Sequence, residues 1–106
     1  MGVTQPALSA NPVWTASGTI TSLEAGWGTD VLGVNTTASV IVNPAGCPGF
    51  YAGYHTSPTD PGHTLYHDML RDAFWHNWPV QLLISGQPGD CSQGNPRIIS
   101  VHIARP

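Results

Sequence analysis

The stretch HTLYHDMLRDAFWHNWPVQLLISG, residues 63–86, decides the fold of this chain. Large apolar side chains recur at steps of three and four through residues 63–78, which is the pattern of an amphipathic helix. Pro79 cannot continue such a helix. The run VQLLIS that follows, residues 80–85, is almost wholly apolar and predicts a strand buried on both faces.

Strand-like patterns flank this stretch on both sides. Residues 13–21 alternate between two faces, and Gly18 inside them predicts a bulge or bend. Residues 31–42 are rich in β-branched side chains, and residues 50–55 alternate aromatic and small ones. Residues 97–104 give the last strand. Turns rich in Gly, Pro, Asp and Asn separate these elements, at residues 24–30, 43–49, 56–62 and 86–96.

The order of elements is therefore three strands, one helix and two strands. It predicts a mainly β fold with one α-helix, and it matches the five-stranded OB-fold barrel of order β-β-β-α-β-β, in which the helix plugs the barrel. The length of 106 residues fits one domain. We expect residues 13–106 to form that single domain, preceded by a flexible arm of residues 1–12, which show no period.

The composition excludes some classes of function. Charged residues make up only 8% of the chain, there is no Lys, and the net charge is -3. Binding to nucleic acid needs several cationic contacts, so nucleic acid is not an expected partner. A surface built from hydroxyl and amide side chains is typical of secreted proteins, and no apolar run approaches the length of a membrane span.

The two cysteines, Cys47 and Cys91, allow two interpretations. A thiol nucleophile or metal ligand is one, but neither cysteine stands in a C-x-x-C pair or beside a residue that could share a metal with it. A structural disulfide agrees better with the secreted character of the surface, and we expect it.

Catalytic patterns are few. His63 and His67 stand four apart on the expected helix, so both rings could reach one metal ion, with Asp60 or Asp68 nearby. No Glu stands between the two histidines as a zinc protease requires, and the chain has no G-x-S-x-G elbow or Gly-rich phosphate loop. We expect no catalytic residue, no metal and no cofactor; a small metal-binding hydrolase using these histidines is one alternative.

The aromatic residues suggest a different chemistry. Trp14, Trp27, Tyr51 and Tyr54 lie in or beside strands and turns, among Ser, Thr, Asn and Gly. Sugars bind to such surfaces because their C–H faces stack on aromatic rings while their hydroxyls bond to short polar groups. The alternative for each ring is a place in the core.

The layout also resembles a known family. A Thr/Ser-rich first strand, a cysteine after the second, the helix LYHDMLRDAFWHN running into VQLLISG and the closing CSQGNPRIISVHI resemble the receptor-binding B subunits of pertussis-like and subtilase-type bacterial toxins. The likeness covers about residues 13–104 and is one of arrangement.

This resemblance implies a secreted OB-fold subunit that binds glycans without catalysis, assembles as a homo-oligomer, a pentamer in those relatives, and can accompany an enzymatic A-type subunit. It implies a sugar contact near the first strand, where Thr15 and Ser17 are the nearest counterparts of the family's serine. The shortage of cations favours neutral glycans over sialic acid. A secreted protein-interaction or inhibitor domain, using the exposed aromatic residues, is the other alternative. The expected ligand-binding residues are thus Trp14, Thr15, Ser17, Trp27, Tyr51 and Tyr54.

Overall fold

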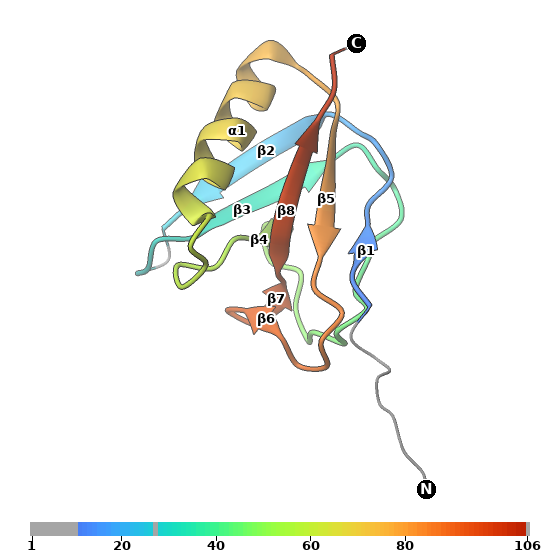
Figure 1. Ribbon diagram of the computed structural model, residues 1–106, viewed down its shortest axis with the longest axis vertical. Coiled ribbons are helices and arrows are strands. Elements are labelled where there is room, and N and C mark those ends of the chain that lie inside the picture. The colour runs from blue at the N-terminus through green and yellow to red at the C-terminus, as the bar shows by residue number, and fades with distance from the viewer. Residues whose placement is uncertain (1–10, 27, 106) are drawn as a thin grey trace, which may run out of the picture.

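A computed structural model describes residues 11–26 and 28–105, and within these ranges the chain forms eight strands and one helix (Figure 1). The elements in chain order are β1 (Val13–Trp14), β2 (Ile20–Ala25), β3 (Leu32–Thr36), β4 (Tyr54–His55), α1 (His63–His76), β5 (Val80–Ile84), β6 (Cys91–Ser92), β7 (Asn95–Pro96) and β8 (Ile98–Ile103). The expectation of a mainly β fold with one helix is confirmed. Of the expected arm, only Asn11 and Pro12 are described, and both are exposed.

The strands form three antiparallel sheets, in the orders β1-β5-β8, β2-β3-β4 and β6-β7. The expected five-stranded closed barrel is therefore wrong. Among the described residues, two isolated bridges connect the backbones of the regions around the two three-stranded sheets, between Gly18 and Val80 and between His55 and Arg97.

The expected first strand divides between the two larger sheets, and Gly18 is the point of division. Trp14 pairs with Leu83 of β5, whereas β2, beginning at Ile20, pairs with β3. A Cβ on Gly18 would lie 2.8 Å from Thr37 Oγ1 and 2.9 Å from the backbone nitrogen of Ala38, so the crossing requires a residue without a side chain.

Two other expected strands are shorter than their patterns indicate. β3 ends at Thr36, and the β-branched residues Val40 and Ile41 lie exposed outside the sheets. The third expected strand keeps only β4, because Ala52 and Gly53 adopt positive φ angles of 59° and 89°. A residue's preference for extended backbone does not make a strand where no neighbouring strand pairs with it.

The helix α1 agrees with the sequence pattern at both ends. Asn77 takes the left-handed conformation, with φ 56°, and the backbone N–H of Trp78 donates to Ala73 O over 3.0 Å, which closes the last turn before Pro79. Leu70 and Ala73 are fully buried, and the helix packs against β2 and β8. No helix within the described ranges has the length and apolar character needed to cross a membrane.

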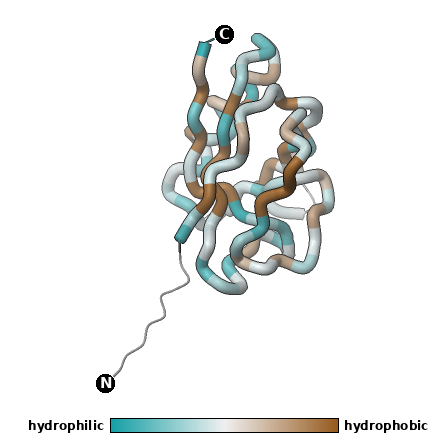
Figure 2. The backbone as a smooth tube through the Cα atoms, turned by 90° about the vertical axis from the view of Figure 1, so that its right-hand side faces the viewer, coloured by the Kyte–Doolittle hydropathy of each residue, from teal (hydrophilic) through white to brown (hydrophobic). Residues whose placement is uncertain are grey.

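The core lies between α1 and the two larger sheets. Its strand β5 alternates rather than being buried on both faces: Val80, Leu82 and Ile84 are buried, while Gln81 and Leu83 are partly exposed. Figure 2 shows the hydrophobic stretches running along neighbouring strands in the middle of the molecule. The core consists of Ile20, Leu32, Val34, Tyr54, Leu70, Ala73, Val80, Leu82, Ile84 and Ile98.

Candidate functional site

A cavity of about 480 Å³ lies where residues 50–55 face the β6–β7 hairpin. Its lining combines one aromatic ring, one imidazole and two amides, from Tyr51, His55, Gln93 and Asn95. The volume lies within the range of small-molecule sites, and a few convergent polar groups beside an aromatic ring are typical of such sites. We call it the Tyr51 cavity.

Tyr51 supplies an exposed aromatic face. The side chain is 73% exposed, although the Tyr51 backbone N–H donates to Asn95 Oδ1 over 2.6 Å. The ring lies close to Gly49, where a Cβ would come within 2.7 Å of Tyr51 Cε2. The backbone is thus anchored while the ring remains open to a ligand.

Asn95 and Gln93 form the opposite wall. Asn95 is only 2% exposed, and its Nδ2 donates to the backbone oxygens of Ser92 (3.3 Å) and Gln93 (3.0 Å). The Gln93 backbone takes a positive φ of 49° in the hairpin turn, and its amide side chain is exposed at the rim. The buried Asn95 side chain therefore joins the hairpin turn to Tyr51.

His55 forms the inner part of the cavity. Its Nδ1 lies 3.1 Å from Gly53 O, and because a carbonyl only accepts hydrogen bonds, Nδ1 carries the proton. Burial lowers the pKa of His55, outweighing the hydrogen bond to Gly53 and the charge of Glu24, which both raise it. At neutral pH the ring is neutral, and its Nε2 is a hydrogen-bond acceptor.

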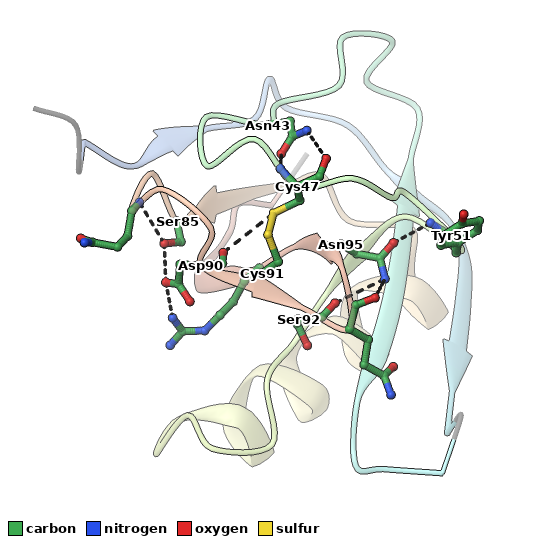
Figure 3. The surroundings of a disulfide bond; sticks show 11 residues. Asn43, Cys47, Tyr51, Ser85, Asp90, Cys91, Ser92 and Asn95 are labelled. Carbon is green, nitrogen blue, oxygen red and sulfur yellow. Dashed lines mark hydrogen bonds and ion pairs between the residues drawn. A yellow bond between two sulfur atoms is a disulfide. The ribbon is translucent and has the colours of Figure 1, made fainter.

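The expected disulfide between Cys47 and Cys91 is present, with a Cα–Cα distance of 5.8 Å. It joins the two segments that form the walls of the Tyr51 cavity (Figure 3). Asn43 holds Cys47 from the other side: its Oδ1 accepts from Cys47 N (2.8 Å) and its Nδ2 donates to Cys47 O (2.9 Å).

The structure separates the ligand-binding residues expected from the sequence. Tyr51 lines the Tyr51 cavity, whereas Ser17 is exposed elsewhere, on the segment between β1 and β2. Trp14, 44% exposed, lines a smaller hollow of about 240 Å³ with Gln81 and His102. The sixth residue on that list, Trp27, lies outside the described residues.

Thr15 and Tyr54 lie in the interior. Thr15 is 2% exposed, and its Oγ1 accepts from the backbone N–H of Leu82 over 3.0 Å. The Tyr54 hydroxyl accepts from Val42 N over 2.8 Å, and burial raises its pKa. Both hydroxyls serve the fold, and neither lines the Tyr51 cavity.

Sequence reasoning missed His55, Gln93 and Asn95. His55 ended an expected strand, and the other two fell in a segment described only as a turn. The expected disulfide was a usable signal, because it places the residues after Cys91 beside those after Cys47.

The histidines at the start of α1 make separate contacts. His63 Nε2 lies 2.8 Å from Asp30 Oδ2, whereas His67 Nε2 lies 2.7 Å from Thr56 Oγ1. Thr56, His67 and Asp30 supply the hydroxyl, imidazole and carboxylate of a catalytic triad. They do not form one, because Thr56 is fully buried and His67 Nδ1 is 3.9 Å from Asp30 Oδ1. Among residues 11–26 and 28–105, no three His, Cys, Asp or Glu side chains gather as a metal site.

The pKa of His63 should lie above 6.5, the pKa of an unperturbed imidazole, and those of His55 and His67 should lie below it. Hydrogen bonds to the Asp60 backbone and the Asp30 carboxylate raise the pKa of His63, while burial lowers that of His55 and His67. NMR titration of the ring protons should show these directions. Asp30→Asn should lower the pKa of His63 and leave His55 unchanged as the control.

These shifts also set a pH dependence of stability. The contribution of His63 is present below pH 6.5 and is lost as pH rises through its raised pKa. The contributions of His55 and His67 are present above pH 6.5 and are lost as pH falls through their lowered pKa values. A His63 midpoint at or below 6.5 would contradict the observed hydrogen bonds.

Comparison of the chain with protein family models, with curated proteins and with solved structures found no match. The chemistry of the Tyr51 cavity therefore carries the functional argument.

Proposed function

We propose that this protein is a lectin-like carbohydrate-binding protein that takes a neutral glycan in the Tyr51 cavity. The observation that carries the proposal is the exposed ring of Tyr51 on a cavity that is also lined by Gln93 and by the buried side chains of Asn95 and His55. A sugar presents C–H groups on its ring faces and hydroxyls around its edge, and this lining combines an exposed aromatic face with polar side chains.

The charges around the cavity favour a neutral ligand. No Arg of the described part of the chain lines it. Arg97 donates to Asp60 Oδ2 (3.0 Å) and Asp90 Oδ2 (2.6 Å), and Arg71 donates to Asp68 on the helix surface. With His55 neutral, an acidic sugar would find no counter-charge there. A glycan array carrying neutral and sialylated sugars tests this proposal, and selective binding to sialylated spots would contradict it.

The relation to toxin B subunits is part of this proposal. The disulfide and the low content of charged residues support a secreted protein. In this role the chain would recognise cell-surface glycans without catalysis, as a homo-oligomer of five subunits and beside an enzymatic A-type subunit. Light scattering on the purified protein measures its mass in solution, and a monomeric mass would remove the pentamer from the proposal.

One observation favours the second candidate function, protein binding. Leu65 and Trp75 on α1 are 60% and 74% exposed, so the helix presents two large apolar side chains to solvent. A protein-interaction or inhibitor domain would use this helix face rather than the Tyr51 cavity. The hydrolase alternative is less well supported, because the Nε2 atoms of His63 and His67 are directed at Asp30 and Thr56.

Tyr51→Ala should weaken binding of any glycan found on the array by about thirtyfold, because the lost stacking and contact area are worth about 2 kcal/mol. Trp75→Ala is the matched control, since it removes an equally exposed aromatic ring from α1. Titration calorimetry measures both affinities. If Trp75→Ala reduces glycan affinity and Tyr51→Ala does not, the ligand binds at the helix and the site has been misplaced.

A further inference from the structure

We propose that the Cys47–Cys91 disulfide controls ligand binding, because it holds together the two walls of the Tyr51 cavity. This inference rests on the proposed function. It adds that the oxidised protein binds and the reduced protein does not, and that a bound ligand in turn protects the disulfide from reduction.

The disulfide lies at one end of both walls. Cys47 precedes Tyr51 by four positions and Cys91 precedes Gln93 by two. Figure 3 shows the sulfur–sulfur bond between the segment that carries Tyr51 and the hairpin that carries Asn95. The cross-link thus sets the separation of the side chains that face each other across the cavity.

Other contacts also join these two segments. Gly89 N donates to Ala45 O (3.0 Å), Ser92 Oγ donates to Thr56 O (2.6 Å), and His55 forms an isolated bridge with Arg97. Gly49 N donates to Gly94 O (2.8 Å), and Tyr51 N donates to Asn95 Oδ1 (2.6 Å). Residues 43–53 contain no strand, and β6 and β7 have two residues each. Each of these hydrogen bonds is weak against the entropy of a free loop, so the covalent cross-link is the strongest single constraint between the walls.

The core does not depend on the cross-link in the same way. The β5–β8 pairing extends over five registered residue pairs, and α1 packs against β8 and β2. Reduction should therefore open the cavity and leave the core folded. The two cysteines bound a segment that includes α1 and β5, yet neither element contributes a residue to the cavity lining.

The redox step is a thiol–disulfide exchange. A dithiol such as dithiothreitol gives two electrons and two protons to the Cys47–Cys91 bond, which yields two cysteine thiols and the cyclic disulfide of the reductant. If reduction weakens glycan binding by a given factor, then saturating glycan must make the disulfide harder to reduce by the same factor, because the coupling is reciprocal. We expect a factor of at least ten.

The test compares oxidised protein with the Cys47→Ser/Cys91→Ser variant and with dithiothreitol-reduced protein, all at low temperature. The first readout is binding to an array of neutral oligosaccharides. The second is amide hydrogen exchange at Gly49 and Tyr51, which report the walls, and at Leu82, which reports the core. We expect reduction to abolish array binding and to speed exchange at the walls at least tenfold, with Leu82 unchanged.

The outcomes separate the two proposals. Equal array binding by the oxidised and reduced proteins, or unchanged wall exchange, would overturn this inference. Loss of protection at Leu82 together with the walls would also overturn it, because the disulfide would then maintain the whole fold. An oxidised protein that binds no glycan counts against the proposed function, while the exchange data still decide whether the disulfide controls the cavity. If the serine variant does not fold, freshly reduced wild-type protein provides the same exchange data.

Discussion

Gly53→Ala is expected to lower the free energy of unfolding by at least about 3 kcal/mol. Gly53 has a φ of +89°, and a Cβ there would overlap the carbonyl group of Val34 in β3. Two costs therefore add: the strain of a side chain in the left-handed region and the displacement of β3 from β4. Because Gly53 O also accepts from His55 Nδ1, the same change should disturb the Tyr51 cavity.

Gly89→Ala is the matched control for this prediction. Gly89 has a similar φ of +75°, but no atom lies within 4 Å of its would-be Cβ, so only the backbone strain remains, at about 1 kcal/mol. Urea unfolding of both variants measures the two losses, provided that the slope with denaturant is unchanged. Similar losses in the two proteins would show that Gly53 is retained for its backbone angle alone and not for the close approach to Val34.

Arg97→Met is expected to cost about 3 kcal/mol of stability, because it leaves two poorly exposed carboxylates without their counter-charge. Arg97 lies directly before β8. It donates to Asp60, which precedes α1, and to Asp90, which follows β5. Asp90 also accepts from Ser85 Oγ over 2.6 Å. The side chains of Arg97 and Asp60 are 22% and 12% exposed.

Two control variants test whether unpaired charge causes the loss of stability in Arg97→Met. Arg71→Met removes an exposed pair with Asp68, whose side chains are more than half exposed, and should change stability by less than about 0.5 kcal/mol. The triple variant Asp60→Asn/Asp90→Asn/Arg97→Met removes both charges and their partner, and should recover most of the loss. A triple variant less stable than Arg97→Met, measured by thermal unfolding, would show that packing rather than unpaired charge is responsible.

The periodic parts of the fold could be predicted from the sequence. The three- and four-residue steps in residues 63–78 gave α1 nearly to its observed end, and β5 and β8 lie within the ranges expected for the last two strands. These signals are local, because a helix or strand imposes its own period on the side chains it buries.

The pairing of the strands could not be predicted from the sequence in this way. Gly18 indicated a bend, but only the close packing of Thr37 and Ala38 shows that the chain changes sheets there. Residues 37–42 have strong β-branched character, yet no strand of the described chain pairs with them. Such outcomes depend on contacts between distant segments, which local preference does not encode.

Of the residues that line the Tyr51 cavity, only Tyr51 was a candidate from the sequence. Tyr51 is one of the expected ligand-binding residues and lines the cavity, whereas Thr15, also expected to bind ligand, is buried with its hydroxyl bonded to Leu82 N. Sequence alternation assumes one wet face for each strand. Thr15 lies on a segment that pairs with β5 before the chain crosses to the second sheet, so its hydroxyl is used inside.

The link between Cys47 and Cys91 also has a consequence for refolding. A chain unfolded by denaturant with this link intact begins its search with two segments, 44 positions apart in sequence, already adjacent. Contacts between these two segments then form at a smaller cost in chain entropy, so the rate of refolding should be higher. Recovery from denaturant should be fast for the cross-linked chain and slow for the chain whose thiols are free.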